Sequence, residues 1–192
     1  INAKKSEDKY FSSNEKNLPL EGITLAIKDE EDIEGQPNTN GSLILKDHIA
    51  TKTMVDVERI VNSGAIIHAR TTTPEFSCTS FTHSKLWGVT RNPWNLDYTP
   101  GGSSGGSGAS LAAGCSTLAT GSDIGGSIRI PASACGLVGF KPPHGRNPQE
   151  APFNHDQYCV VGPMARSVQD CALMQNVMSG PHPKDITSLK PK

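Results

Sequence analysis

The segment 101–108 consists only of glycine and serine, and a second glycine pair stands directly before Ser127. Glycine–serine stretches are most often flexible linkers between domains. This one instead runs directly into residues 109–114, whose small side chains predict a helix, so it does not separate two domains. Glycines in such loops allow backbone N–H groups to face a ligand without an obstructing side chain. The two segments therefore predict ligand-binding loops inside one domain.

Short apolar runs and helical patterns flank these loops. Residues 23–28 form a β-branched run that predicts a strand, and residues 65–69 form a second one. Residues 53–62 and 164–178 carry apolar side chains at helical spacing, with Met164 as the first of the second set. A helix, a glycine and a strand in close succession favour an α/β layer architecture.

The length of 192 residues suits one domain or part of a larger one. We expect a polar leader over residues 1–17, either poorly ordered or helical, a core over residues 18–180, and a tail over residues 181–192. Prolines interrupt residues 71–100, which are predicted to be mostly loop, and residues 160–161 predict a short strand.

The composition excludes several classes of protein. The formal net charge of −1 gives no electrostatic basis for binding nucleic acid or a membrane surface. No apolar run approaches the roughly 20 residues that a membrane helix needs. The 5 cysteines are an odd number without CxxC pairs, which argues against a disulfide framework or a zinc site. We therefore expect reduced thiols, no metal, no cofactor and a cytoplasmic location.

Two common loop motifs do not fit. A phosphate-binding loop needs a lysine directly after its glycines, and the nearest downstream lysine is Lys141. Residues 101–105 match the G-x-S-x-G pattern of α/β-hydrolases, but the proline-containing residues 92–100 cannot form the central strand that must precede it. The nearby histidines stand in polar stretches typical of a surface: His144, His155 and His182.

Taken together, the two glycine–serine segments resemble the signature of the amidase signature family. The resemblance extends from about residue 18 to residue 180 and is most specific over residues 121–132. The matching stretches are Gly22–Asp29, Arg70–Phe76, Gly101–Ser107, Gly121–Ala132, Cys135–Pro142 and Val161–Val168.

The resemblance implies a catalytic triad. It implies that Ser127 is the nucleophile, that Lys28 is the base, and that Ser103, with a cis peptide bond before it, relays the proton between them. Ser104 is the alternative relay. The other implied site residues are the oxyanion-hole backbone N–H groups of Ile124, Gly125 and Gly126, with Ser127 as a further donor, and the supporting residues Asp123 and Arg129, which we expect to pair across the turn.

A lysine serves as a base only when its amine is neutral, and burial without a carboxylate partner favours the neutral form. Lys28 is the lysine that follows an apolar strand, whereas the others stand in polar, terminal or proline-flanked contexts. The adjacent Asp29 is expected to point to the opposite face of the strand. We interpret Ser107 and Ser122 as ordinary loop serines.

The resemblance implies an amidase that hydrolyses a linear carboxamide of a small molecule through an acyl-enzyme. Two alternatives stay open, namely the glutaminase subunit of a tRNA-dependent amidotransferase and a noncatalytic subunit with the same fold. The implied fold is α/β, a mixed twisted sheet between helices, of which this chain holds only part. Family members are typically more than twice as long, so the expected partners are the missing C-terminal half of the same polypeptide and, in a homodimer, a second copy.

The chain departs from the usual family pattern at four positions outside the implied triad: Arg70, Thr72, Ser122 and Pro143. Pro143 changes the loop beneath the site, so that loop gives no basis for naming a substrate.

Overall fold

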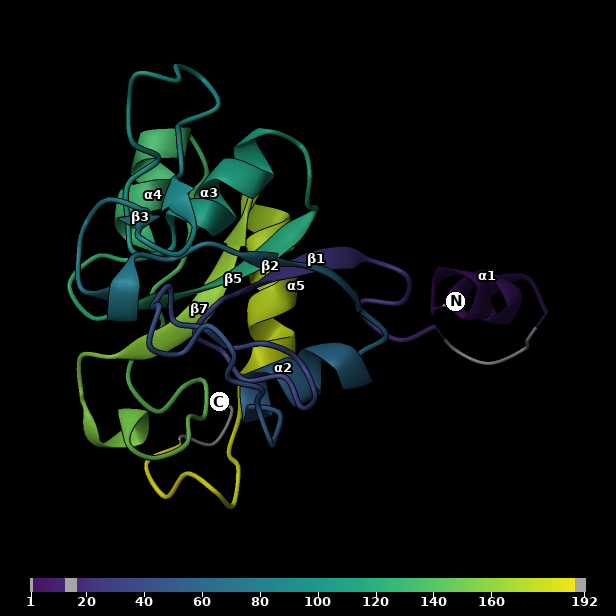
Figure 1. Ribbon diagram of the computed structural model, residues 1–192. Helices are drawn as coiled ribbons and strands as arrows, with labels where there is room; N and C mark the ends of the chain where they lie inside the picture. The colour runs from purple at the N-terminus through teal and green to yellow at the C-terminus, as the bar shows by residue number, and fades with distance from the viewer. Residues whose placement is uncertain (1, 13–16, 189–192) are drawn as a thin grey trace.

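The computed structural model describes residues 2–12 and 17–188 of the chain (Figure 1). In this part of the chain the helices are α1 Asn2–Ser12, α2 Val55–Asn62, α3 Gly105–Ala112, α4 Arg129–Cys135 and α5 Val168–Met178, with short 3₁₀ helices η1 Glu75–Ser77 and η2 Phe153–His155. The strands are β1 Thr24–Lys28, β2 Ile66–Thr71, β3 His83–Ser84, β4 Gly88–Val89, β5 Leu118–Asp123, β6 Val138–Gly139 and β7 Val160–Ala165.

The main sheet is mixed and has the strand order β2-β1-β5-β7-β6. Strands β2, β1 and β5 are parallel, and β7 runs antiparallel to both β5 and β6. Every residue of β5 is buried, as expected for a strand that is paired on both sides and covered on both faces. The short strands β3 and β4 form a separate hairpin.

Helices cover both faces of the sheet (Figure 1). Leu25 and Ile27 of β1 belong to a buried cluster with side chains of α2 and α5. Ala26 of the same strand belongs to a second cluster, formed with α3 and α4. Because side chains alternate along a strand, Lys28 continues the face that carries Ala26. The fold class expected from the sequence, a mixed α/β sheet between helices, is confirmed.

The elements predicted from apolar periodicity around β1, α2 and β2 are present with shifts of one or two residues. Helix α2 ends at Asn62, and Gly64 follows with a positive φ of 91°. The short strand predicted at residues 160–161 extends to Ala165.

The prediction of one helix from residue 164 was wrong. Met164 lies in β7, fully buried, and the helix starts only at Val168, where Ser167 accepts a hydrogen bond from the Asp170 backbone N–H. The apolar spacing of residues 164–178 was misleading because Met164, in β7, happens to stand at helical spacing from the buried residues of α5.

The glycine–serine segment is more helical than its composition suggests. Helix α3 begins at Gly105 rather than at residue 109. A Cβ atom at Gly106 would lie 2.3 Å from the backbone nitrogen of Thr72, just beyond β2. The glycines therefore allow α3 to pack closely against the chain after β2. The stabilisation from this packing outweighs the low intrinsic helix propensity of glycine.

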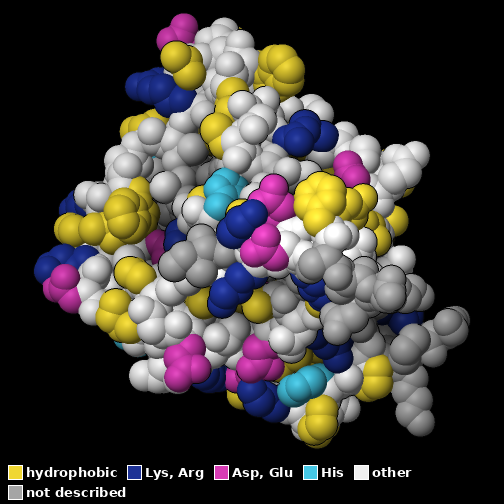
Figure 2. Space-filling model, turned by 90° about the vertical axis from the view of Figure 1, so that its right-hand side faces the viewer, with side chains coloured by type: hydrophobic (Ala, Val, Ile, Leu, Met, Phe, Trp, Pro, Cys, Tyr) yellow, Lys and Arg dark blue, Asp and Glu magenta, His cyan; other side chains and the backbone are white. Residues whose placement is uncertain are grey.

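The predicted leader and tail lie partly outside the described residues, which exclude residues 1, 13–16 and 189–192. Within the leader, α1 is helical and Lys9 forms an ion pair with Glu21 at 2.9 Å. None of the helices in residues 2–12 and 17–188 is long and apolar enough to cross a membrane. On the face shown in Figure 2, the described acidic and basic side chains are interspersed rather than gathered into one patch.

Candidate active site

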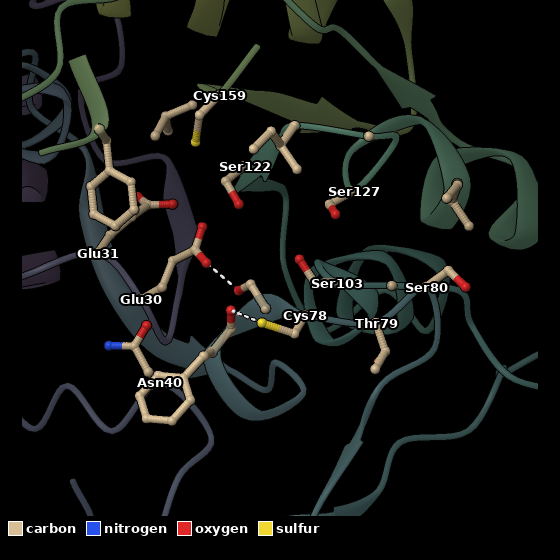
Figure 3. Close-up of a pocket in the computed structure, with 18 of the residues that line it drawn as sticks. Glu30, Glu31, Asn40, Cys78, Thr79, Ser80, Ser103, Ser122, Ser127 and Cys159 are labelled. Atoms are coloured by element: carbon tan, nitrogen blue, oxygen red, sulfur yellow. Dashed lines mark hydrogen bonds between the residues drawn. The ribbon is translucent and has the colours of Figure 1, made fainter. Parts of the chain in front are cut away.

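The implied catalytic residues meet at the carboxyl ends of the parallel strands β1 and β5, where α/β sheets commonly bind ligands. A cavity of about 550 Å³ opens there. Its wall includes Glu30, Ser103, Ser122, Ser127 and Cys159 (Figure 3). Segments distant in the sequence therefore contribute to one pocket.

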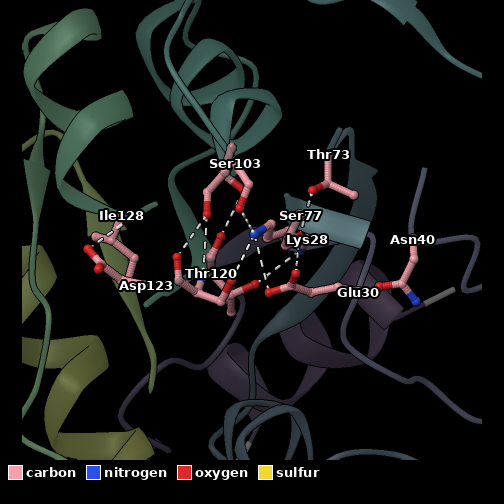
Figure 4. Close-up of polar contacts among 12 residues, drawn as sticks. Lys28, Glu30, Asn40, Thr73, Ser77, Ser103, Thr120, Asp123 and Ile128 are labelled. Atoms are coloured by element: carbon pink, nitrogen blue, oxygen red, sulfur yellow. Dashed lines mark hydrogen bonds and ion pairs between the residues drawn. The ribbon is translucent and has the colours of Figure 1, made fainter. Parts of the chain in front are cut away.

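Lys28 is the last residue of β1 and is fully buried behind this wall. Its Nζ atom lies 2.8 Å from Ser103 Oγ and 2.8 Å from Ser122 Oγ. A third contact joins Lys28 Nζ to Glu30 Oε1 at 3.2 Å (Figure 4). The expectation that Lys28 lacks a carboxylate partner was wrong. Asp29 does point away from it, as expected, and accepts hydrogen bonds from Thr39 and Trp87 instead.

Ser103 is fully buried and stands one residue before Ser104, the N-cap of α3. The peptide bond between Gly102 and Ser103 is cis, as the resemblance implied. Ser103 and Ser127 both line the pocket, and in Figure 3 their hydroxyl groups face the same space. Ser127 itself is half-buried. The structure thus places the two serines on one wall, with Lys28 behind Ser103.

Ser104, the alternative relay, has different neighbours. Its Oγ atom donates to the backbone oxygen of Ser122 at 3.4 Å and accepts from the Ser122 backbone N–H at 3.3 Å. Its own N–H donates to the backbone oxygen of Ser127 at 3.2 Å. Ser104 therefore ties the start of α3 to β5 and to the Ser127 loop, and its hydroxyl has no hydrogen bond to Lys28 in the described structure.

The loop before Ser127 forms part of the pocket wall. Ile124 and Gly125 line the cavity, and their N–H groups have no hydrogen-bond partner among the described residues. The N–H of Gly126, by contrast, donates to Asp123 Oδ1 at 2.7 Å. The donor expected at Gly126 is thus already occupied, which leaves Ile124, Gly125 and Ser127 as the available set.

Asp123 organises this loop from the end of β5. Its carboxylate accepts hydrogen bonds from Arg129 Nε and Nη2, both at 2.9 Å, so the expected pairing across the turn is present. Lys141 Nζ adds a contact at 3.2 Å, and the Ile128 N–H donates to Oδ2 at 3.2 Å. Burial of the carboxylate favours its protonation, but these donors outweigh that effect and lower the pKa of Asp123 to about 2.

Glu30 is a site residue that the sequence analysis missed. Its carboxylate contacts Lys28 Nζ and accepts a hydrogen bond from Ser77 Oγ, which in turn lies 2.9 Å from Thr73 Oγ1 (Figure 4). Burial acts to raise the pKa of Glu30, but the charge of Lys28 and hydrogen bonds from Ser122 and Ser77 outweigh it and lower that pKa. Strand β1 ends at Lys28 and Glu30 lies in the turn that follows, so the alternation of side chains along a strand could not have placed Glu30 beside Lys28.

The contact of Ser122 with Lys28 was also missed from the sequence. It lies in β5 rather than in a loop, and it is one of the three groups on Lys28 Nζ. Ser107, the other serine interpreted as part of a loop, lies in α3 and is buried, where its Oγ donates to the Thr120 backbone oxygen at 2.7 Å. The register between β1 and β5 decides these contacts, and no local pattern encodes it.

Glu31 is the second carboxylate of the pocket wall. It is fully buried, and neither of its carboxylate oxygens has a hydrogen-bond partner among the described residues. Burial, followed by the charge of Asp56, raises the pKa of Glu31 well above its ordinary value. In the described part of the chain, no group of three or more His, Cys, Asp or Glu side chains is arranged to hold a metal ion.

Comparison with known proteins gives a consistent result. The family model described as "Amidase" matches residues 1–192. A glutamyl-tRNA(Gln) amidotransferase subunit of Desulforapulum autotrophicum is 46% identical over 176 residues, which cover 90% of this chain and 35% of that protein.

Solved structures agree with these sequence matches. A bacterial aryl acylamidase of the amidase signature family superimposes with a TM-score of 0.92 at 34% identity, covering 100% of this chain and 40% of that one. A glutamyl-tRNA(Gln) amidotransferase subunit of Thermotoga maritima gives a TM-score of 0.84 at 34% identity, covering 93% of this chain and 40% of that one. The chain therefore spans about two fifths of the length of these relatives. Its matched sequence and its fold show that the chain belongs to the amidase family, among the amidase signature enzymes.

Proposed function

We propose that this chain carries the catalytic centre of an amidase that hydrolyses a carboxamide bond through an acyl-enzyme on Ser127. The observation that carries the proposal is the buried contact of 2.8 Å between Lys28 Nζ and Ser103 Oγ, on the wall of the pocket that Ser127 lines. A serine hydroxyl needs a base to become a nucleophile, and this contact supplies the last step of a route for its proton, from Ser103 to Lys28.

In the acylation step, the neutral amine of Lys28 takes the proton of Ser103, and Ser103 takes the proton of Ser127. The Ser127 oxygen then forms a bond to the amide carbonyl carbon, and the carbonyl electron pair moves onto its oxygen. When this tetrahedral intermediate collapses, the C–N bond breaks. Ser103 protonates the departing nitrogen and is reprotonated from Lys28, so the amine leaves neutral and Ser127 holds an acyl ester.

In the deacylation step, a water molecule replaces the amine. Ser103 and Lys28 accept a proton from the water, whose oxygen attacks the ester carbonyl. Ser127 recovers its proton as the carboxylic acid leaves. The products are one amine and one carboxylic acid, and the enzyme returns to its starting state.

The negative charge that develops on the carbonyl oxygen needs donors. The backbone N–H groups of Ile124, Gly125 and Ser127 are available for it, and such a donor is typically worth about 3 kcal/mol in the transition state. Asp123 supports this arrangement, because its hydrogen bonds to the N–H groups of Gly126 and Ile128 fix the loop on either side of Ser127.

A second candidate function rests on the curated relatives, several of which are named as glutamyl-tRNA(Gln) amidotransferase subunits, including that of Brachyspira hyodysenteriae at 44% identity over 191 residues. In that case the amide would be the side chain of glutamine, and the released ammonia would pass to a partner protein. Ammonia release from glutamine that rises when such partners are added favours this candidate. Hydrolysis of simple amides without any partner favours the free-standing amidase.

The test of the catalytic centre is intact-mass analysis of the full-length protein after treatment with a fluorophosphonate probe, which reacts with activated serines. We expect one adduct, and we expect the Ser127→Ala variant to lose it. A folded wild-type protein that gains no adduct would argue for a noncatalytic role, and an adduct that persists in Ser127→Ala would place the nucleophile at another serine.

A further inference from the structure

The amine of Lys28 has three hydrogen-bonding neighbours, namely Ser103, Ser122 and Glu30, at 2.8, 2.8 and 3.2 Å. A neutral lysine amine has two N–H donors and one lone pair. Glu30, as a carboxylate, only accepts hydrogen bonds, so it occupies one N–H. If Ser122 accepts the second N–H, the lone pair is left facing Ser103, the group from which Lys28 takes a proton in the proposed mechanism.

We propose that Glu30 is a positioning residue for the base: its carboxylate accepts a hydrogen bond from the amine of Lys28 and so orients that amine toward Ser103. This inference rests on the proposed function of the pocket, and it assigns a role to a side chain that would not touch the reacting amide.

Glu30 is held in place on its far side. Ser77 donates a hydrogen bond to Glu30, and Thr73 stands 2.9 Å from the Ser77 hydroxyl. Ser77 adopts a left-handed backbone with φ of 56°, which non-glycine residues keep only where the surrounding structure fixes them. With its side chain only 14% exposed, Glu30 is thus a fixed carboxylate rather than a mobile surface one.

Other ionisable groups near this pair need to be separated from Glu30. The second wall carboxylate, Glu31, is close enough to Asp56 and to the Arg70 guanidinium that both charges act on it. Cys159, on the segment leading into β7, is close enough to both Lys28 and Glu30 that their charges act on it, although burial raises its pKa to about 11. The remaining charged side chains around the site have partners of their own: Asp29 with Thr39 and Trp87, and Asp123 with Arg129 and Lys141.

The experiment measures the rate constant of fluorophosphonate labelling at Ser127 against pH, in the full-length wild type and three variants. Glu30→Gln removes the charge but keeps an oxygen that accepts from Lys28. Glu30→Ala removes both. Glu31→Gln is the matched control, because it makes the same exchange at the neighbouring wall residue, which has no hydrogen bond to Lys28 in the described structure.

We expect Glu30→Gln to keep the upper plateau of the rate profile within a few fold of wild type, because its side-chain oxygen still accepts from Lys28. We expect Glu30→Ala to lower that plateau by at least about 10-fold, since one N–H of Lys28 loses its acceptor. Glu31→Gln should stay within a few fold of wild type. Equal losses in Glu30→Gln and Glu30→Ala, or a loss in Glu31→Gln as large as that in Glu30→Ala, would overturn the assignment of Glu30.

A separate measurement keeps this inference distinct from the proposed function. If wild-type Ser127 is not labelled at all, the proposed function fails, and the role of Glu30 is then read from the Lys28 amine alone. The ¹³C NMR signal of lysine labelled at the ε-carbon reports the surroundings of that amine, and Lys28→Met identifies its resonance. A resonance that stays near its wild-type position in Glu30→Gln but moves in Glu30→Ala supports the orienting role, and equal changes in the two variants refute it.

Discussion

The Nζ atom of Lys28 and the Oγ atom of Ser103 lie 2.8 Å apart, both fully buried, although 75 positions separate the two residues in the chain. The adjacent Ser104 has its hydroxyl directed to the backbone of Ser122 instead. Two neighbouring serines thus differ sharply in their access to the buried amine, and this difference favours Ser103 over Ser104 as the proposed proton relay.

Alanine substitutions of these two serines should therefore give different results. We expect Ser103→Ala to lower kcat/KM for an amide substrate by at least about 100-fold, because the proton route from Ser127 to Lys28 is interrupted. Ser104→Ala should cost less than about 10-fold and about 1 kcal/mol of stability, the value of a typical intramolecular hydrogen bond. Steady-state kinetics and urea unfolding of both variants measure this. The reverse order of kinetic losses would make Ser104 the relay.

The ion pair between Lys28 and Glu30 predicts a recovery of stability in a double variant. Lys28→Met alone should lower the free energy of unfolding by about 2 kcal/mol, because it leaves the carboxylate of Glu30 in the pocket wall without its cation. Lys28→Met combined with Glu30→Gln should regain at least half of that loss, while activity stays absent. Urea unfolding midpoints of wild type, both single variants and the double variant form the required cycle. Purely additive losses would mean that the pair is not coupled.

Asp123 predicts a pH dependence of stability. Its pKa is about 2 in the folded protein against an ordinary value of 3.8, so its contribution to stability is complete above about pH 4 and is lost as the pH falls toward 2. The difference corresponds to about 2 kcal/mol. We expect Asp123→Asn to be less stable by about that amount at pH 7 and to lose less stability than wild type between pH 4 and pH 2. Thermal unfolding across this range provides the comparison, and parallel curves for the two proteins would contradict it.

The glycines of the two loops should differ in how well they tolerate substitution by alanine. A Cβ atom at Gly106 would lie 2.3 Å from the Thr72 backbone nitrogen, so Gly106→Ala must displace α3 from the chain beyond β2 and should cost about 3 kcal/mol. Gly125 has no atom within 4 Å of such a Cβ, so Gly125→Ala should change stability by less than about 0.5 kcal/mol. Unfolding measurements on the two variants decide this. Comparable losses of stability would show that α3 can move away from Thr72 at little cost.

Local patterns in the sequence were sufficient for part of the fold. The β-branched run that ends at Lys28 and the apolar spacing of α2 predicted their elements, because each carries its own periodicity. Helix α3 was not predicted from Gly105, since its glycines are selected by a tertiary contact with Thr72 and not by helix propensity. Met164 was misassigned for a related reason: burial on both faces of β7 removes the alternation that marks a strand.

The site was predictable in its residue types but not in all its contacts. The resemblance supplied Lys28, Ser103 and Ser127, and the structure brings these residues to one pocket. The contacts of Lys28 with Glu30 and Ser122 depend on how the chain turns after β1 and on the register of β1 with β5. These are relations between distant segments, and no single stretch of sequence contains them.

The pairing of β1 with β5 also constrains the order of events during folding. The backbone N–H of Lys28 donates to Thr120 Oγ1 across a sequence separation of 92 residues. Forming this contact closes a long loop, and the chain loses the corresponding entropy before the strand pairing stabilises it. Local helices such as α2 can form early, whereas the neighbourhood of Lys28 exists only after the two strands have docked. Recovery of labelling at Ser127 should accordingly trail the recovery of helical circular dichroism when the protein refolds from urea.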